Sequence, residues 1–180
     1  PMYGYIYHEY VNNFMGNQIC MALDSTDYSY TYRLAYSFAC GDMFTIVLNN
    51  DYQIVDAWCL SKTINKDVAL KFIKNLSLWR NKDKEFLHYG KMIKPLNYSS
   101  NIKEFVHEDG TILSDKAVLT VAFSFSNEIR QYFINYTLEE QTIILDKEFE
   151  YYIDPISKEI NKDKIIKIKP LSVVAIRRKK

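Results

Sequence analysis

The N-terminal stretch PMYGYIYHEY places the polar pair His8-Glu9 at the end of a run rich in aromatic residues. Imidazole and carboxyl groups are side chains that commonly move protons in enzymes. Tyr7 and Tyr10 flank the pair, and a tyrosine ring can pack in a core or stack on a bound ligand. A polar pair in this place indicates either a functional site or the solvated end of a buried segment.

The other side chains that commonly carry chemistry are scattered along the chain. The three cysteines, Cys20, Cys40 and Cys59, show no CxxC spacing, and the three histidines lie far apart. We therefore expect buried thiols, with no zinc site, no disulfide framework and no cofactor. The sequence also contains no Walker loop, no GxGxxG fingerprint and no GxSxG nucleophile motif.

Composition and charge exclude several classes of partner. The chain has 180 residues, 48% of them hydrophobic, so it can build a packed core. Its 23 basic and 22 acidic residues give a net charge of +1, which predicts no nucleic-acid and no membrane partner. No apolar run approaches the length that spans a bilayer. We expect the basic end, residues 177–180, to be a solvated tail.

The first half of the chain alternates patterns typical of strands and helices. Short apolar runs predict strands, and apolar residues spaced by three or four positions predict helices. Strands are predicted over residues 2–8, 44–48 and 53–58, and helices over 28–39, 65–79 and 84–89. Gly41 stands where a glycine commonly ends a helix. Alternating strands and helices favour parallel βαβ units.

The second half has the pattern of an all-β segment. Apolar residues alternate with polar ones over 119–125, which is typical of a half-buried strand. Further strands are predicted over residues 131–136, 142–145, 149–153, 164–168 and 171–176. Short strands separated by turn residues favour paired antiparallel sheets. We expect two domains, residues 1–95 and 96–180, and the alternative is a single α+β domain.

Several stretches resemble one family. PMYGYIYHEY resembles a late strand of the (β/α)8 barrel in a group of bacterial glycoside hydrolases known as a domain of unknown function. YRLAYSFACGDMFTIVL resembles the helix and last barrel strand that follow, and EFLHYGKMIKPL resembles the segment that leaves the barrel. YFINYTLEEQTIILD and IIKIKPLSVVAIRRK resemble the β-sandwich appended to many glycosidases.

This resemblance implies a fold and a reaction. Residues 1–95 would be the last βα units of a (β/α)8 barrel, and residues 96–180 a C-terminal antiparallel β-sandwich. The whole protein would cleave an oligosaccharide or glycoside, a reaction that normally uses two carboxyl groups. Glu9 would be one of them, at the C-terminal end of a barrel strand, with its partner upstream. The substrate-binding residues implied are His8, Tyr7, Tyr10, Asn49 and Asp51.

Other interpretations stand beside this one. Adjacent strand residues point to opposite faces, so His8 and Glu9 share a pocket only if the strand has ended before them. The rival function is a non-catalytic carbohydrate-binding or structural interaction module. Because the chain begins Pro1-Met2, we expect a longer protein upstream. We expect the chain alone to be inactive and to self-associate through an open sheet edge.

Overall fold

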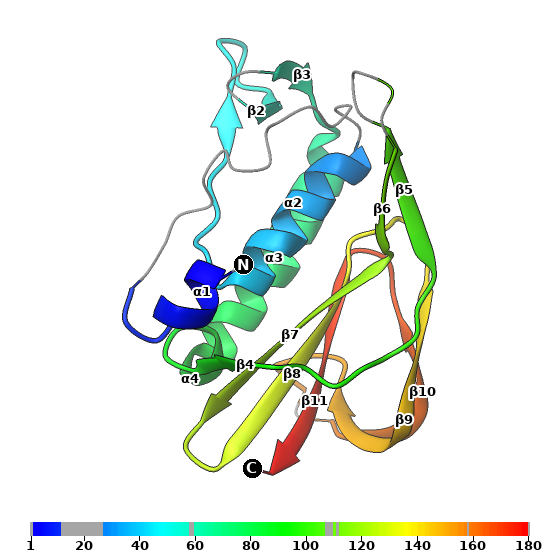
Figure 1. Ribbon diagram of the computed structural model, residues 1–180. Helices are drawn as coiled ribbons and strands as arrows, with labels where there is room; N and C mark the ends of the chain where they lie inside the picture. The colour runs from blue at the N-terminus through cyan, green and yellow to red at the C-terminus, as the bar shows by residue number, and fades with distance from the viewer. Residues whose placement is uncertain are drawn as a thin grey trace.

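The computed structural model describes residues 2–11, 27–57, 60–106, 110, 112–157 and 159–179, as helices packed on antiparallel sheets (Figure 1). The elements are α1 (Met2–Tyr7), α2 (Asp27–Cys40), β1 (Val47–Leu48), β2 (Ile54–Ala57), β3 (Leu60–Thr63), α3 (Lys66–Lys82), α4 (Lys84–Leu87), β4 (Lys91–Ile93), β5 (Ile102–Val106), β6 (Ile112–Lys116), β7 (Val118–Phe125), β8 (Glu128–Asn135), β9 (Gln141–Tyr152), β10 (Asn161–Ile168) and β11 (Ser172–Lys179). No helix in these ranges is both long and apolar enough to cross a bilayer.

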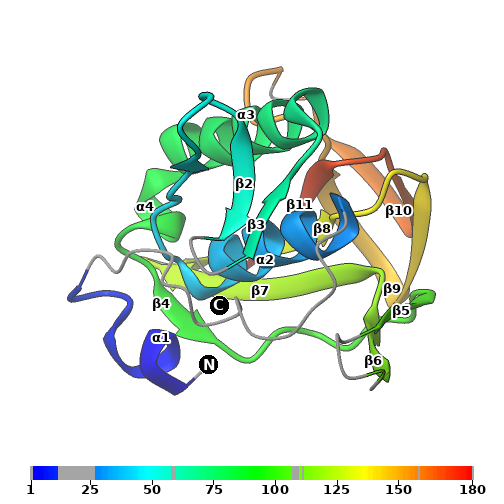
Figure 2. The same ribbon diagram turned by 90° about the horizontal axis from the view of Figure 1, so that it is seen from above.

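The main sheet has six strands in the order β10-β9-β11-β8-β7-β4. Helices α2 and α3 lie side by side across one face of this sheet, against β7, β8 and β11 (Figures 1 and 2). Tyr132 of β8 is fully buried at their contact, with the rings of Phe38 and Trp79 each 5.8 Å away in edge-on geometry. These residues form the middle of the helix-side core.

A second core lies on the other face of the sheet. In β8, Tyr132 and Ile134 belong to the helix-side core, whereas Phe133 between them belongs to the second core. This alternation follows from the two-residue period of a strand. Figure 1 shows β9 and β10 curving away from β7 and β8, and their Ile143 and Ile166 complete the second core. Both faces of the central strands are therefore covered by apolar side chains.

The expected mixture of helices and antiparallel sheet is confirmed, but the described residues contain no parallel barrel units. Every strand pairing that the structure describes is antiparallel. The predicted buried strand over 44–48 is wrong. Only Val47–Leu48 pair, at the edge of the three-stranded sheet β1-β2-β3, and Leu48 is 54% exposed. A two-residue edge strand cannot bury a continuous apolar run on both faces.

The predicted strand over residues 2–8 is also wrong, because this segment forms helix α1. The His8 N–H donates to Gly4 O at 3.0 Å, the spacing of a helical turn. A Cβ built on Gly4 would lie 2.9 Å from Cys40 O, so the glycine allows α1 to pack closely on the end of α2. A short apolar run does not distinguish a strand from a buried helix, and here the packing decides.

The predicted helices are confirmed, and their ends follow local signals. Helix α2 ends at Gly41, whose φ of +79° is a left-handed conformation that glycine adopts readily. Helix α3 begins after Asn65, whose Oδ1 accepts hydrogen bonds from Asp67 N and Val68 N. The predicted strands over 142–145 and 149–153 form one long strand, β9.

The division expected at residue 95 stays a prediction. Strand β4, before this point, pairs with β7, after it. The helix-side core also joins side chains from both sides, among them Phe38 of α2 and Tyr132 of β8. The first and second halves therefore share one core.

The two outer strands of the main sheet differ in character. Strand β10 exposes Lys162, Lys164 and Lys167, and its pairing with β9 shifts register between Asp163 and Ile165. Charges and bulges on an outer strand oppose pairing with another sheet. Strand β4 at the other side is three residues long and packs against α1. The sheet is thus bordered by lysines at one side and by a helix at the other.

Candidate functional site

His8 lies inside the protein and holds α1 in place. Its Nδ1 is 2.8 Å from Gly90 O and its Nε2 is 3.1 Å from Leu87 O. The ring also packs against Phe123, with the centroids 4.4 Å apart. Both ring nitrogens therefore contact backbone carbonyls near the end of α4. The imidazole of His8 therefore fastens α1 to the rest of the fold, and its predicted role in substrate binding stays a prediction.

Glu9, Tyr7 and Tyr10 lie at the surface around the turn that follows α1. The backbone N–H groups of Tyr10 and Val11 both donate to Tyr7 O, at 2.9 and 3.0 Å. Tyr7 and Tyr10 are exposed, Tyr10 by 76%, and Glu9 is partly exposed. Glu9, Tyr7 and Tyr10 are not among the lining residues of the two clefts described below, and their predicted roles stay predictions.

Asn49 and Asp51 occupy the turn between β1 and β2. Asn49 Oδ1 accepts from Asp51 N at 3.0 Å and from Gln53 N at 2.9 Å, and Asn49 Nδ2 donates to Gln53 Oε1 at 3.0 Å. Such bonds shape a tight turn. Figures 1 and 2 show this hairpin well away from α1, so the structure does not bring Asn49 and Asp51 together with Glu9.

A buried arginine secures the end of α2 beside His8. Arg80 of α3 donates from Nη1 to Asp42 O at 2.6 Å and from Nη2 to Gly41 O at 3.1 Å. A positive charge at a helix C-terminus is favourable because it meets carbonyl groups that lack partners. A Cβ on Gly41 would lie 1.9 Å from His8 Cδ2. We call this contact of His8, Gly41 and Arg80 the helix junction.

The helix junction predicts a pH dependence. Burial lowers the pKa of His8, and the nearby Arg80 charge acts in the same direction, against the Gly90 and Leu87 carbonyls and Asp42. A histidine whose pKa is lowered by folding binds fewer protons in the folded than in the unfolded state, so stability falls as pH decreases through about 6.5. We expect the free energy of unfolding to decrease between about pH 7.5 and 5.5. We expect His8→Gln to remove part of this slope, as measured by urea denaturation. Stability that rises on acidification, with a His8 ring that titrates above its usual range by NMR, would contradict this expectation.

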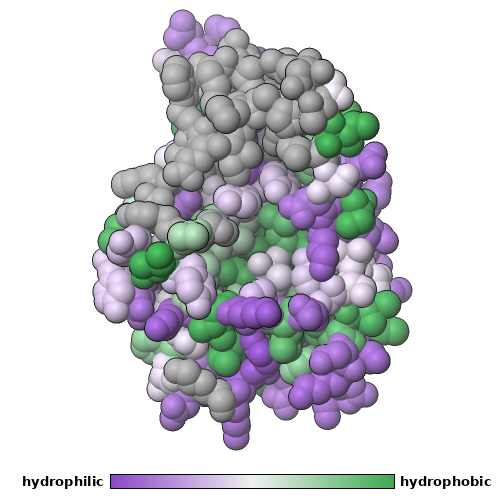
Figure 3. Space-filling model, in the orientation of Figure 1, coloured by the Kyte–Doolittle hydropathy of each residue, from purple (hydrophilic) through white to green (hydrophobic). Residues whose placement is uncertain are grey.

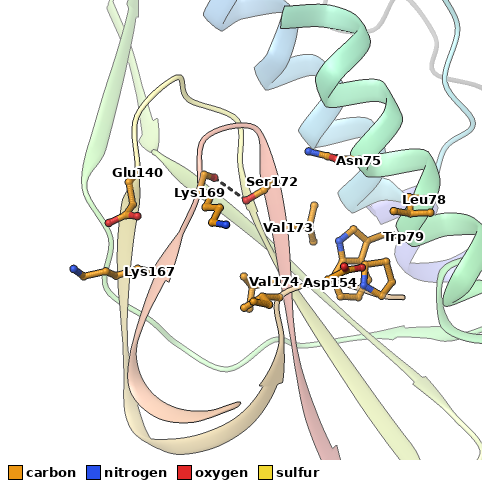
Figure 4. Close-up of a pocket in the computed structure, with 12 residues that line it drawn as sticks. Asn75, Leu78, Trp79, Glu140, Asp154, Lys167, Lys169, Ser172, Val173 and Val174 are labelled. Carbon is orange, nitrogen blue, oxygen red and sulfur yellow. Dashed lines mark hydrogen bonds between the residues drawn. The ribbon is translucent and has the colours of Figure 1, made fainter. Parts of the chain in front are cut away.

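One cleft lies between α3, the strands β10 and β11 and the segments just before and after β9, with a volume of about 490 Å³ (Figure 4). We call it the α3 cleft. Its charged lining residues are Glu140, Asp154, Lys167 and Lys169. Trp79 at its base is only 3% exposed. Asn75 Nδ2 donates to Leu171 O, and Ser172 Oγ donates to Lys169 O, each at 2.7 Å. Asn75 and Ser172 therefore already use these donor groups in hydrogen bonds within the protein.

A second cleft, of about 560 Å³, lies between α1, α2 and the strands β4 and β7. We call it the α1 cleft. Its apolar lining residues are Met2, Ala39, Met92, Ile93, Leu119 and Val121. Tyr5, Tyr36, Lys94 and Asp115 add polar groups. Figure 3 shows hydrophobic side chains at the centre of this face of the molecule, framed by hydrophilic ones.

Asp115 is the carboxylate of the α1 cleft. Tyr32 OH donates to Asp115 Oδ2 at 2.8 Å, and the backbone N–H of Lys116 donates to Oδ1 at 2.7 Å. Burial raises the pKa of Tyr32 and of Tyr36, so both hydroxyls stay protonated and able to donate. The sequence interpretation missed Asp115 because it lies in the hairpin β5–β6, which no alternation pattern indicated.

The thiols give no nucleophile or metal site in the part of the chain that the structure describes. Cys40 lies at the α1 cleft, where burial raises its pKa to about 12 and keeps it protonated. Cys20 and Cys59, the other two predicted buried thiols, lie outside the described residues. Among those residues no group of three or more His, Cys, Asp or Glu side chains is close enough to hold a metal ion.

Comparisons with known proteins give only distant similarities. No family model matches the sequence, and no curated protein matches it. A GH42 beta-galactosidase from G. stearothermophilus is similar with a TM-score of 0.31 and 14% identity, over 67% of this chain and 14% of that one. A gamma-CGTase from Alkalophilic bacillus clarkii has a TM-score of 0.44 and 14% identity, over 89% of this chain and 25% of that one. A conserved exported protein from Bacteroides fragilis has a TM-score of 0.29 and 20% identity, over 43% and 18% of the two chains. The chain thus spans a quarter or less of each of these structures.

Proposed function

We propose that the chain is the C-terminal portion of a carbohydrate-active hydrolase, and that its antiparallel sheet supports helices of the catalytic part. The observation that carries this proposal is the contact between α2 and α3 and the sheet strands β7, β8 and β11. The segments that resemble glycoside hydrolases supply both sides of this contact. YRLAYSFAC forms α2, and YFINYT and LSVVAIRRK contribute to β8 and β11.

The contact supports a structural role for the sheet. Phe38 of α2 and Trp79 of α3 pack edge-on against Tyr132, which lies in the middle of the sheet. Helices on the outside of a large enzyme need an apolar surface to cover them. A sheet that provides this surface stabilises helices without itself taking part in the reaction. In this proposal residues 1–95 belong with the catalytic part and residues 96–180 support it.

The proposal assigns one carboxyl group of the reaction to Glu9. Hydrolysis of a glycosidic bond normally uses one carboxyl group to protonate the leaving oxygen and another to attack or to activate water. Glu9 is partly exposed and stands between the exposed Tyr7 and Tyr10, where a sugar could reach it. The second carboxyl group would come from another part of a longer protein. The chain alone would then bind sugar without cleaving it.

The test is a hydrolysis assay of the longer protein on aryl-glycosides and oligosaccharides, with and without Glu9→Gln. We expect the substitution to lower kcat by about 10²–10⁴-fold, because acid–base groups contribute on that order. Glu148→Gln is the matched control, since Glu148 is exposed on β9 and forms only a surface contact of 3.7 Å with Lys162. Activity of Glu9→Gln that equals that of Glu148→Gln would remove Glu9 from the catalytic pair.

A second candidate function is a non-catalytic carbohydrate-binding or interaction module. It is favoured by the tyrosines exposed on and after α1, which are Tyr5, Tyr7 and Tyr10. Exposed aromatic rings suit both sugar stacking and protein interfaces. Retention of the chain on a gel containing soluble polysaccharide, together with no hydrolysis by the longer protein, would favour this candidate.

A further inference from the structure

We propose that the α1 cleft is a sugar-binding subsite for one or two pyranose rings, with Asp115 as its hydrogen-bonding anchor. This inference rests on the proposed carbohydrate function and adds the place of binding and the residues that bind. The subsite differs from the surface around Glu9. It uses Tyr5 and Tyr36, whose role the sequence pattern did not indicate.

The size and composition of the α1 cleft suit a small cyclic ligand. Its volume of about 560 Å³ falls in the range of typical small-molecule sites, about 300–1,000 Å³. Met92, Leu119 and Val121 from the sheet give it an apolar base. Small-molecule sites commonly combine an apolar lining with a few polar groups that orient the ligand. The α1 cleft has this combination.

Two tyrosines from different helices line the α1 cleft. Tyr5 of α1 is 56% exposed, and Tyr36 of α2 is partly buried. A pyranose ring has a face made of C–H groups, which packs well on an aromatic ring, and hydroxyl groups at its edge. Tyr5 loses exposed apolar surface when such a ring covers it, so binding is favoured by the hydrophobic effect.

Asp115 has hydrogen-bonding capacity left for a ligand. A carboxylate offers about four lone-pair sites. Tyr32 OH occupies one on Oδ2 and Lys116 N occupies one on Oδ1, so each oxygen can accept another donor. These two bonds also fix the direction of the carboxylate. Hydroxyl groups of a sugar can therefore donate to an anchor that is already oriented.

The charges of the α1 cleft favour a sugar over a purely apolar ligand. Asp115 offers only acceptors and Lys94 offers only donors, and a hydroxyl group satisfies either. A hydrocarbon in the same place would shield Asp115 from water without replacing its hydrogen bonds, which costs binding energy. A polyhydroxylated ring avoids this cost at both charges.

The α3 cleft is a weaker candidate for the same ligand. Its aromatic residue, Trp79, is 3% exposed and packs against Tyr132, so a sugar cannot stack on it. Asn75 and Ser172 donate to backbone carbonyls of the protein. The α1 cleft alone of these two combines an exposed aromatic ring with a carboxylate that retains free acceptor sites.

The experiment is a calorimetric titration of the chain with methyl β-galactopyranoside, methyl α-glucopyranoside, maltose and cellobiose, with cyclohexanol as the apolar probe. We expect at least one sugar to bind, and both Asp115→Asn and Tyr5→Ala to weaken it about tenfold or more. The matched controls are Glu104→Gln, an exposed carboxylate on the neighbouring strand β5, and Tyr89→Ala, a 59% exposed tyrosine outside the cleft. We expect both controls to bind like the native chain. Asp115→Asn has one acceptor oxygen in place of the two that Tyr32 OH and the Lys116 N–H use, so unfolding midpoints are measured to verify that all variants are folded.

Two outcomes would overturn the subsite. One is that no sugar binds at millimolar concentration. The other is that cyclohexanol binds as well as any sugar and that its affinity is unchanged by Asp115→Asn.

The result also separates this inference from the proposed function. If the longer protein hydrolyses glycosides while the chain binds no probe, only the subsite fails. If the chain binds a sugar through Asp115 while the longer protein hydrolyses nothing, only the hydrolase proposal fails.

Discussion

Replacing Tyr132 by alanine should lower the free energy of unfolding by about 3–5 kcal/mol, the usual cost of removing a large aromatic side chain from a core. Tyr132 is fully buried and contacts the rings of Phe38 and Trp79 at 5.8 Å and of Phe123 at 6.3 Å. The substitution therefore removes the side chain on which α2 and α3 both pack. Urea denaturation followed by circular dichroism measures the effect, and Tyr10→Ala is the control at an exposed tyrosine.

The hydroxyl group of Tyr132 contributes separately. It donates to Asp83 Oδ2 at 2.7 Å, and burial raises the pKa of Asp83 while this hydrogen bond lowers it. Tyr132→Phe removes the donor, so we expect a loss of about 1–3 kcal/mol at pH 7. This hydrogen bond favours the ionised form of Asp83, so its removal matters less once Asp83 is protonated. The loss caused by Tyr132→Phe should therefore shrink as pH falls towards 4.

For Tyr132→Ala, a loss of less than about 1 kcal/mol would show that α2 and α3 do not depend on packing against Tyr132.

Gly41→Ala should destabilise the protein by about 2–4 kcal/mol through two separate effects. The first is the backbone, because φ at Gly41 is +79° and a left-handed alanine costs about 1–2 kcal/mol. The second is steric, because the new Cβ would lie 1.9 Å from His8 Cδ2 and 2.2 Å from His8 Nε2. His8 would have to leave the Gly90 and Leu87 carbonyls, and α1 would lose its attachment.

A double-mutant cycle separates the two effects. In a His8→Ala background the steric effect is absent, so Gly41→Ala should cost only the backbone part, about 1–2 kcal/mol. Thermal or urea unfolding of the four proteins gives the coupling energy. Equal costs of Gly41→Ala in both backgrounds would mean that His8 and Gly41 are not in contact in solution.

Helices and central strands were predictable because their signals are local. Gly41 and Asn65 mark helix ends by their own conformation and hydrogen bonds, and the alternation over 119–125 marks strand β7, although both of its faces are largely covered. Strands β3, β4, β5 and β6 were missed. Each is stabilised by a partner strand rather than by a pattern within itself, as Lys91–Ile93 pair with Ser124–Ala122.

The α1 segment and the candidate site show why the rest was not predictable. The run MYGYIY is apolar throughout, so it carries neither a two-residue nor a 3.6-residue period. Its helical form depends on Gly4 meeting Cys40 O and on His8 meeting Gly90 O, which are contacts between distant parts of the chain. Tyr32 and Asp115 are 83 positions apart in the sequence and 2.8 Å apart in the structure. A single sequence contains no spacing that reveals such a pair.

The borders of the main sheet bear on how concentrated solutions of the protein behave. Lysines on β10 oppose the edge-to-edge pairing of one sheet with another, which is a first step in fibril growth. Strand β4 is a short edge with a single lysine, Lys91, and α1 packs against it. Since His8 holds α1 and burial lowers its pKa, we expect mild acid to weaken the attachment of α1 beside β4. A solution buffered above the histidine range should therefore stay clear on storage longer than an acidic one.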